Sequence, residues 1–172
     1  MKVLNQQETT QWLERRGHVE DPHLNVDWVN ALPENYFHMM RRAPIAYGSI
    51  ESFTDQYLNE IVTDGDLLLQ IVEWDVWCEP RGFIIKSLLP TFDETVPYRK
   101  MGGFLFKKSE WKNAIAIFSL TTSFMWKSYL YGEFDQAALY NWEGEIFDCW
   151  TSSSVKHQAV DRLFLQFNLL PV

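Results

Sequence analysis

The sequence predicts a single globular α/β (or α+β) domain over residues 1–172, with a mixed sheet of about five to six strands flanked by four to five helices. Three observations predict this fold class. Short apolar runs bounded by turn residues are typical of strands. Between them lie segments whose apolar residues recur at helical spacing. A chain of 172 residues is also long enough to bury a core without metals or disulfides.

Five segments carry helix signals. Thr9 or Thr10 can cap the first helix, which should end at Gly17 because glycine readily adopts the conformation that follows a helix. Ser49 or Ser52 can cap a second helix, whose apolar stripe ends before Gly65. The other three are a short helix at Phe83–Leu89, the longest helix from Ser109 and Glu110, and a final helix at Val155–Phe167 after Ser152–Ser154.

Six segments are candidate strands, although the first could equally be a helical turn. They are Tyr36–Met40, Leu67–Trp77, Phe104–Phe106, Tyr129–Tyr131, Ala137–Trp142 and Glu145–Trp150. The most informative is Leu67–Trp77, an apolar run whose end interleaves two carboxylates with two tryptophans. In an α/β sheet, that end of a strand is where binding sites usually lie.

The chain is acidic and its charge is unevenly spread. It has 23 Asp and Glu against 15 Lys and Arg, a formal net charge of −8. Residues 128–150 contain acids and no bases, whereas residues 81–127 are net positive. An acidic balance argues against non-specific binding to nucleic acid or to anionic membranes, and it favours a basic partner or simply solubility.

Cysteine usage and the lack of a signal peptide or of an apolar segment long enough to span a membrane predict a cytoplasmic protein. Cys78 and Cys149 are the two cysteines, and they form neither a disulfide framework nor a Cys-x-x-Cys motif. The N-terminus lacks the apolar core of a signal peptide. No apolar run approaches the ~20 residues that a membrane span needs.

Residues 65–150 also carry a combination of motifs: Glu73-Trp-Asp-Val-Trp, a short helix, Gly103-Phe-Leu-Phe and a helix led by Glu110. This combination resembles a loose group of uncharacterised bacterial proteins that share a strand ending Glu-Trp-x-x-Trp, a helix, a Gly-x-Leu-Phe strand and another helix. The resemblance covers about half of the chain and implies an α/β fold. That group has no assigned activity, so the resemblance implies no catalytic residue.

No motif in the sequence defines a catalytic, cofactor or metal chemistry. The four histidines are scattered without the spacing of zinc ligands. Asp64 and Asp66 suit a turn around Gly65, and they lie ~25–30 Å from the carboxylates at the far end of the predicted strand, too far to share one ion. Serine-nucleophile and phosphate-binding motifs are absent. We therefore expect no metal, no cofactor and no assigned catalytic residue.

Two groups of carboxylates and aromatic residues are candidate sites. The first lies at the end of strand 67–77, and the second lies on a predicted hairpin over residues 137–150. Trp and Tyr are enriched in interface hot spots, and carboxylates attract basic partners. The predicted partner-binding residues are Glu73, Asp75, Trp77, Tyr140, Trp142, Glu143, Glu145 and Asp148. Both groups could equally be ordinary solvated surface.

These observations favour a non-catalytic, acidic protein-binding module, either monomeric or homodimeric, that binds neither nucleic acid nor membranes. Its most specific form is an immunity or antitoxin-type inhibitor of a basic toxin domain, because carboxylates can replace substrate phosphates at a cationic site. One alternative is a small hydrolase or transferase that uses the strand-end pair Glu73 and Asp75 as general acid and base. Another is a homodimeric structural domain.

Overall fold

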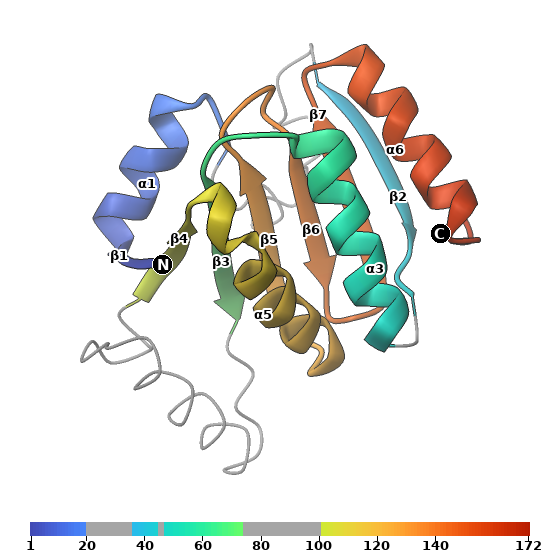
Figure 1. The fold of residues 1–172 in the computed structure, drawn as a ribbon, viewed down its shortest axis with the longest axis horizontal. Helices are drawn as coiled ribbons and strands as arrows, with labels where there is room; N and C mark the ends of the chain where they lie inside the picture. The colour runs from blue at the N-terminus through green and yellow to red at the C-terminus, as the bar shows by residue number, and fades with distance from the viewer. Residues whose placement is uncertain (20–35, 45–46, 74–100) are drawn as a thin grey trace.

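The computed structural model describes residues 1–19, 36–44, 47–73 and 101–172, and it has the α/β class that the sequence predicts (Figure 1). The strands in the described residues are β1 (Lys2–Asn5), β2 (Phe37–Arg42), β3 (Leu67–Glu73), β4 (Met101–Phe106), β5 (Lys127–Gly132), β6 (Ala138–Trp142) and β7 (Ile146–Thr151). The α-helices there are α1 (Gln6–Arg15), α3 (Tyr47–Tyr57), α5 (Trp111–Ser123) and α6 (Ser154–Gln166). A π-helical turn, η2 (Leu58–Val62), extends α3, and a 3-10 turn, η5 (Lys108–Glu110), precedes α5.

The seven described strands form one sheet in the order β1-β4-β3-β5-β6-β7-β2, and each neighbouring pair is antiparallel. This corrects the expectation of five to six strands in a mixed sheet. The missing strand is β1, because its four residues are too few to show an alternating pattern. In an antiparallel sheet the end of one strand lies beside the start of the next, so the rule for parallel sheets does not locate a site here.

The first helix begins earlier than Thr9, because Asn5 and Glu8 form a capping box. The Glu8 N–H donates to Asn5 Oδ1 at 3.0 Å, and the Asn5 N–H donates to Glu8 Oε2 at 2.9 Å. These two bonds satisfy backbone donors that a helix start leaves without partners. Thr9 is instead buried against the sheet, and α1 ends before Gly17 as predicted.

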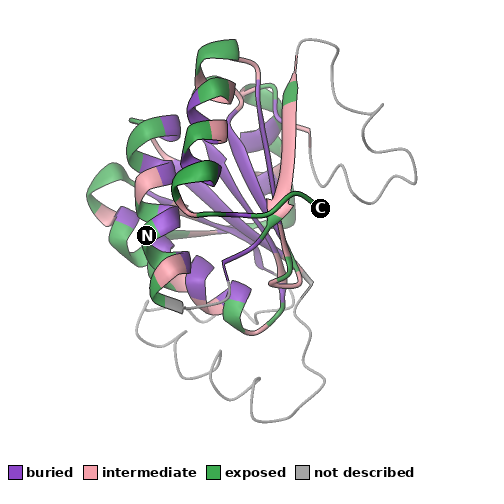
Figure 2. Cartoon of the chain, turned by 90° about the vertical axis from the view of Figure 1, so that its right-hand side faces the viewer, coloured by how far each residue is buried: buried purple, intermediate pink, exposed green. Residues whose placement is uncertain are grey.

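Helices α3, α5 and α6 lie over one face of the sheet, in front of it in Figure 1. Phe53 of α3 is the centre of this core layer, with its ring stacked on Phe164 of α6 and close to Phe147 of β7. All three side chains are fully buried, and Figure 2 shows the buried layer between helices and sheet. A buried phenylalanine contributes about 1.5–3 kcal/mol, so this cluster anchors both helices to the sheet.

The opposite face of the sheet is aromatic and partly polar, and α1 covers the part of it that β4 contributes. Cross-strand register places Gln70, Tyr129, Tyr140, Asp148 and Met40 in one row from β3 to β2. Residues directly opposite one another in an antiparallel sheet share a face. The first four residues of this row form a polar band within an otherwise largely apolar layer.

Several predictions from the sequence fall on residues 20–35, 45–46 and 74–100, which lie outside the described residues. They include most of the loop over residues 18–35, the helix at Phe83–Leu89, and the individual residues Asp75, Trp77 and Cys78. Within the described part of the chain, no helix combines the length and the apolar character needed to cross a bilayer.

Candidate functional site

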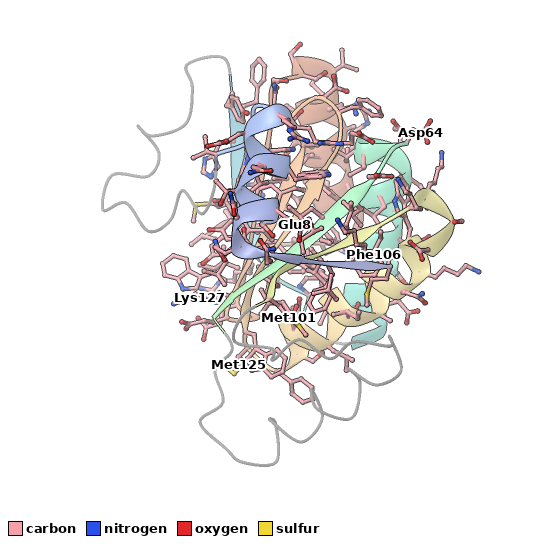
Figure 3. The ribbon with its side chains drawn as sticks, turned by 90° about the vertical axis from the view of Figure 1, so that its left-hand side faces the viewer. Glu8, Asp64, Met101, Phe106, Met125 and Lys127 are labelled. Atoms are coloured by element: carbon pink, nitrogen blue, oxygen red, sulfur yellow. The ribbon has the colours of Figure 1, made fainter. Side chains whose placement is uncertain are left out.

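The backbone of Glu73 and the hairpin residues Trp142, Glu143 and Glu145 lie at the same end of the sheet. Glu73, the last residue of β3, pairs with Lys127 of β5, and the next residue of β5 pairs with Asn141 of β6. Neighbouring strands lie about 4.8 Å apart. The backbone of Glu73 is therefore roughly 10 Å from the turn that joins β6 to β7. In Figure 3, Met125 and Lys127 mark this end, far from Asp64 at the other.

We call this region the sheet-end surface, and its residues are Met125, Trp142, Glu143 and Glu145. Trp142 is 40% exposed and Met125 is 50% exposed. Glu143 forms an ion pair with Lys127, with Oε1 and Nζ 3.1 Å apart. Glu145 is exposed and has no ion pair with any described residue. Aromatic residues and methionine are enriched in protein interfaces, whereas carboxylates suit the polar rim of an interface rather than its core.

A buried polar network holds the turn of the β6–β7 hairpin in place. The Asn141 side chain is fully buried, and its Oδ1 accepts from the Gly144 N–H at 3.0 Å. Its Nδ2 donates to the Trp126 carbonyl at 2.7 Å, which ties the hairpin to the loop after α5. Glu143 and Gly144 both have positive φ, of 52° and 72°, as in the two-residue turns that suit hairpins. The exposed residues therefore stand on a rigid turn.

Two residues predicted for this surface lie elsewhere. Tyr140 is 3% exposed and stacks on Tyr129 with ring centroids 4.3 Å apart. Asp148 is fully buried, and its Oδ1 lies 2.5 Å from His38 Nε2 of the edge strand β2. By strand alternation both share a face of the sheet with Trp142, but they lie one residue pair farther from the turn on that face, within the buried aromatic layer. In this structure they do not belong to the exposed hairpin face that the sequence analysis assigned to them.

The Asp148–His38 pair is the feature of this region that sequence reasoning missed. The two residues are far apart in the chain, and only the pairing of β2 with β7 brings them together. A buried carboxylate beside an imidazole can orient the ring by accepting a hydrogen bond from a ring N–H. The adjacent residue, Cys149, faces the opposite core layer, where burial raises the pKa of its thiol well above the ordinary value.

The outer face of α3 and η2 adds carboxylates that the sequence analysis did not single out. Glu51, Asp55 and Glu60 are all exposed, and none forms an ion pair with a described residue. The stretch Tyr47–Val62 contains no Lys or Arg, which was the signal available in the sequence. The first turn of α3 lies beside the hairpin turn, because Ser49 and Glu145 line the same groove. Glu51, the first of these carboxylates, lies two residues after Ser49 on α3.

The two carboxylates of the turn at Gly65 form ion pairs with lysines. Lys107 Nζ lies 2.8 Å from Asp66, and Lys108 Nζ lies 3.2 Å from Asp64. In the described ranges no three His, Cys, Asp or Glu side chains are close enough together to hold a metal ion. Asp64 and Asp66 flank the turn at Gly65, where the sequence placed them.

Comparison with known proteins finds no family model, no curated protein and no solved structure that matches this chain.

Proposed function

We propose that this protein is a non-catalytic binding module that docks a basic protein partner on its sheet-end surface and on the adjoining acidic face of α3. An immunity-type inhibitor of a basic toxin domain is the specific form of this proposal. Such an inhibitor needs an apolar anchor to dock against and carboxylates that neutralise a cationic site.

The single observation that carries the proposal is the exposed Trp142 on a pre-ordered turn. The buried Asn141 amide fixes that turn before any partner arrives. Ordering loops and side chains on binding costs affinity, so an anchor that is already held contributes more of its contact energy. Tryptophan is also the residue most enriched among binding hot spots.

The exposed carboxylates that lack a basic partner support binding of a basic protein at the same surface. Ion pairs neutralise Glu143, Asp135 and Asp66, whereas the carboxylates of Glu51, Asp55, Glu60 and Glu145 have no basic partner among the described residues. Unneutralised exposed carboxylates set the electrostatic potential that a basic partner meets as it approaches. Of these carboxylates, Glu145 lies in the same hairpin turn as Trp142.

Trp142→Ala should weaken binding of the partner by roughly 30- to 1000-fold, the range of a hot-spot residue. The matched control is Phe134→Ala, because Phe134 is 51% exposed but lies beside Gly65 at the opposite end of the sheet. The partner is first captured with the wild-type protein from the native cells, and calorimetry then gives its dissociation constant for each variant. Equal losses in the two variants would remove Trp142 as the anchor.

A further inference from the structure

A pocket of about 200 Å³ opens between α1 and the edge strand β1 with its neighbour β4, on the side of the molecule that faces the viewer in Figure 3. Lys2 pairs with Leu105 across the two strands, and Leu4 follows two residues later, so these three side chains share one face. The other lining residues recur at helical spacing on α1 and its C-cap, and therefore form one stripe of that helix. They are Glu8, Gln11, Trp12, Arg15 and Arg16. The walls of the pocket are therefore a helix and two paired strands.

The lining of this pocket is positively charged, although the protein as a whole is acidic. Its charged residues are three cations, Lys2, Arg15 and Arg16, and one carboxylate, Glu8. Lys2 Nζ lies 3.0 Å from Glu8 Oε1. Arg16 Nη2 lies 2.6 Å from Oε1 of Glu133, which is outside the lining. Arg15 is exposed and forms no ion pair with a described residue, so the pocket offers one unneutralised cation to a ligand.

Two lining residues also carry a buried N–H that has no acceptor among the described residues. Trp12 is 7% exposed, and neither its indole Nε1–H nor the Nε–H of Arg16 has a hydrogen-bond partner there. The Arg16 guanidinium carbon lies 4.2 Å from the centroid of the Trp12 ring, so both donors belong to one stacked pair. Indole and guanidinium groups donate hydrogen bonds and accept none. The partner that satisfies both donors is therefore an acceptor.

We propose that this pocket binds a small organic oxyanion, a carboxylate or phosphate monoester with a short apolar chain. The oxygens of the ligand pair with Arg15, whose guanidinium matches carboxylate and phosphate geometry, and accept hydrogen bonds from Trp12 and Arg16. The apolar chain packs on Leu4 and Leu105, which belong to the aromatic core layer or lie against it. The volume is below the range of about 300–1,000 Å³ for drug-sized ligands, which favours a compact ligand over a nucleotide. The site is independent of the proposed function, because none of its lining residues belongs to the sheet-end surface or to α3.

Three probes that share one propyl group test the pocket: propyl phosphate, butanoate and propylammonium. Each is titrated into the ¹⁵N-labelled full chain, and NMR follows the indole N–H signal of Trp12, which is identified as the signal that Trp12→Phe lacks. We expect at least one anion to shift this signal with a dissociation constant of about 0.1–1 mM at low salt, and more weakly at moderate salt. Tighter binding of propyl phosphate would identify a phosphate monoester as the ligand class, and tighter binding of butanoate a carboxylate. Propylammonium should not bind.

Arg15→Gln should weaken binding of the anion at least about tenfold, because it removes the unneutralised cation of the pocket. The matched control is Arg162→Gln, which removes an exposed arginine of α6 that has no ion pair with a described residue. This control should bind the anion as wild type does. The proposal would be overturned by an unshifted Trp12 signal with both anions, by equal binding of propylammonium, or by equal binding to wild type and Arg15→Gln.

Discussion

Gly144→Ala should destabilise the protein by about 2–4 kcal/mol. Gly144 has a φ of +72°, a conformation that costs an alanine energy because of its Cβ. A Cβ there would also lie 2.4 Å from the Thr122 carbonyl oxygen of α5. That oxygen cannot easily retreat, because it accepts a hydrogen bond from the Met125 N–H. The hairpin turn would have to leave its contact with α5, and the sheet-end surface would lose its support.

Urea unfolding of wild type and variant measures this loss directly. The matched control is Gly48→Ala in α3, where no atom lies within 4 Å of the added Cβ and φ is not positive. Alanine favours a helix over glycine by roughly 0.5–1 kcal/mol, so this variant should be as stable as wild type or slightly more stable. If Gly144→Ala were within about 1 kcal/mol of wild type in stability, roughly the error of such measurements, that result would contradict the packing described for the turn.

The buried His18 should make stability fall by about 2 kcal/mol between pH 7 and pH 5. Its Nε2–H donates to the Gly132 carbonyl at 2.7 Å, and its ring lies between Trp12 and Tyr131. Burial lowers the pKa of His18 from 6.5 to about 4. The unfolded chain binds a proton near pH 6.5 whereas the folded protein does not, so the stability present above that pH is lost as pH falls toward 4.

His18→Phe should remove this pH dependence while keeping an aromatic ring against Trp12. The pKa values of Glu8, Asp64 and Glu110 are lowered, so these carboxylates stay ionised over most of the interval from pH 7 to pH 5, and the difference between wild type and His18→Phe separates His18 from the other three histidines. The free energy of unfolding is measured at several pH values for each protein. A slope in His18→Phe equal to that of wild type would refute the assignment.

Local patterns in the sequence predicted much of the fold. The apolar stripe from Phe53 to Val62 predicted the helix that α3 and η2 form, and serines before residue 155 predicted α6, which Ser153 caps. The antiparallel order of the sheet could not be predicted in this way. Strand order depends on contacts between segments distant in the chain, and periodicity within one segment does not report them.

The candidate site was predicted only in part for the same reason. The sequence singled out Trp142, Glu143 and Glu145, and the structure places them at an exposed turn. Asp148 belongs to the same short strand pattern, but the pairing of β7 with β2 buries it against His38. The sequence shows that a carboxylate is present at Asp148. Whether that carboxylate is exposed to solvent or buried against an imidazole depends on which strand pairs with β7.

A comparison of Glu145→Lys with Glu14→Lys tests most directly whether a basic partner docks at the sheet-end surface. Both residues are exposed glutamates without an ion pair among the described residues, and both substitutions change the net charge equally, but Glu14 lies on α1. The association rate constant with the captured partner is measured at low and moderate salt. We predict a steep fall with salt for wild type, and a loss of about tenfold at low salt in Glu145→Lys only. A salt-independent rate, or equal loss in both variants, would contradict docking of a basic partner at the sheet-end surface.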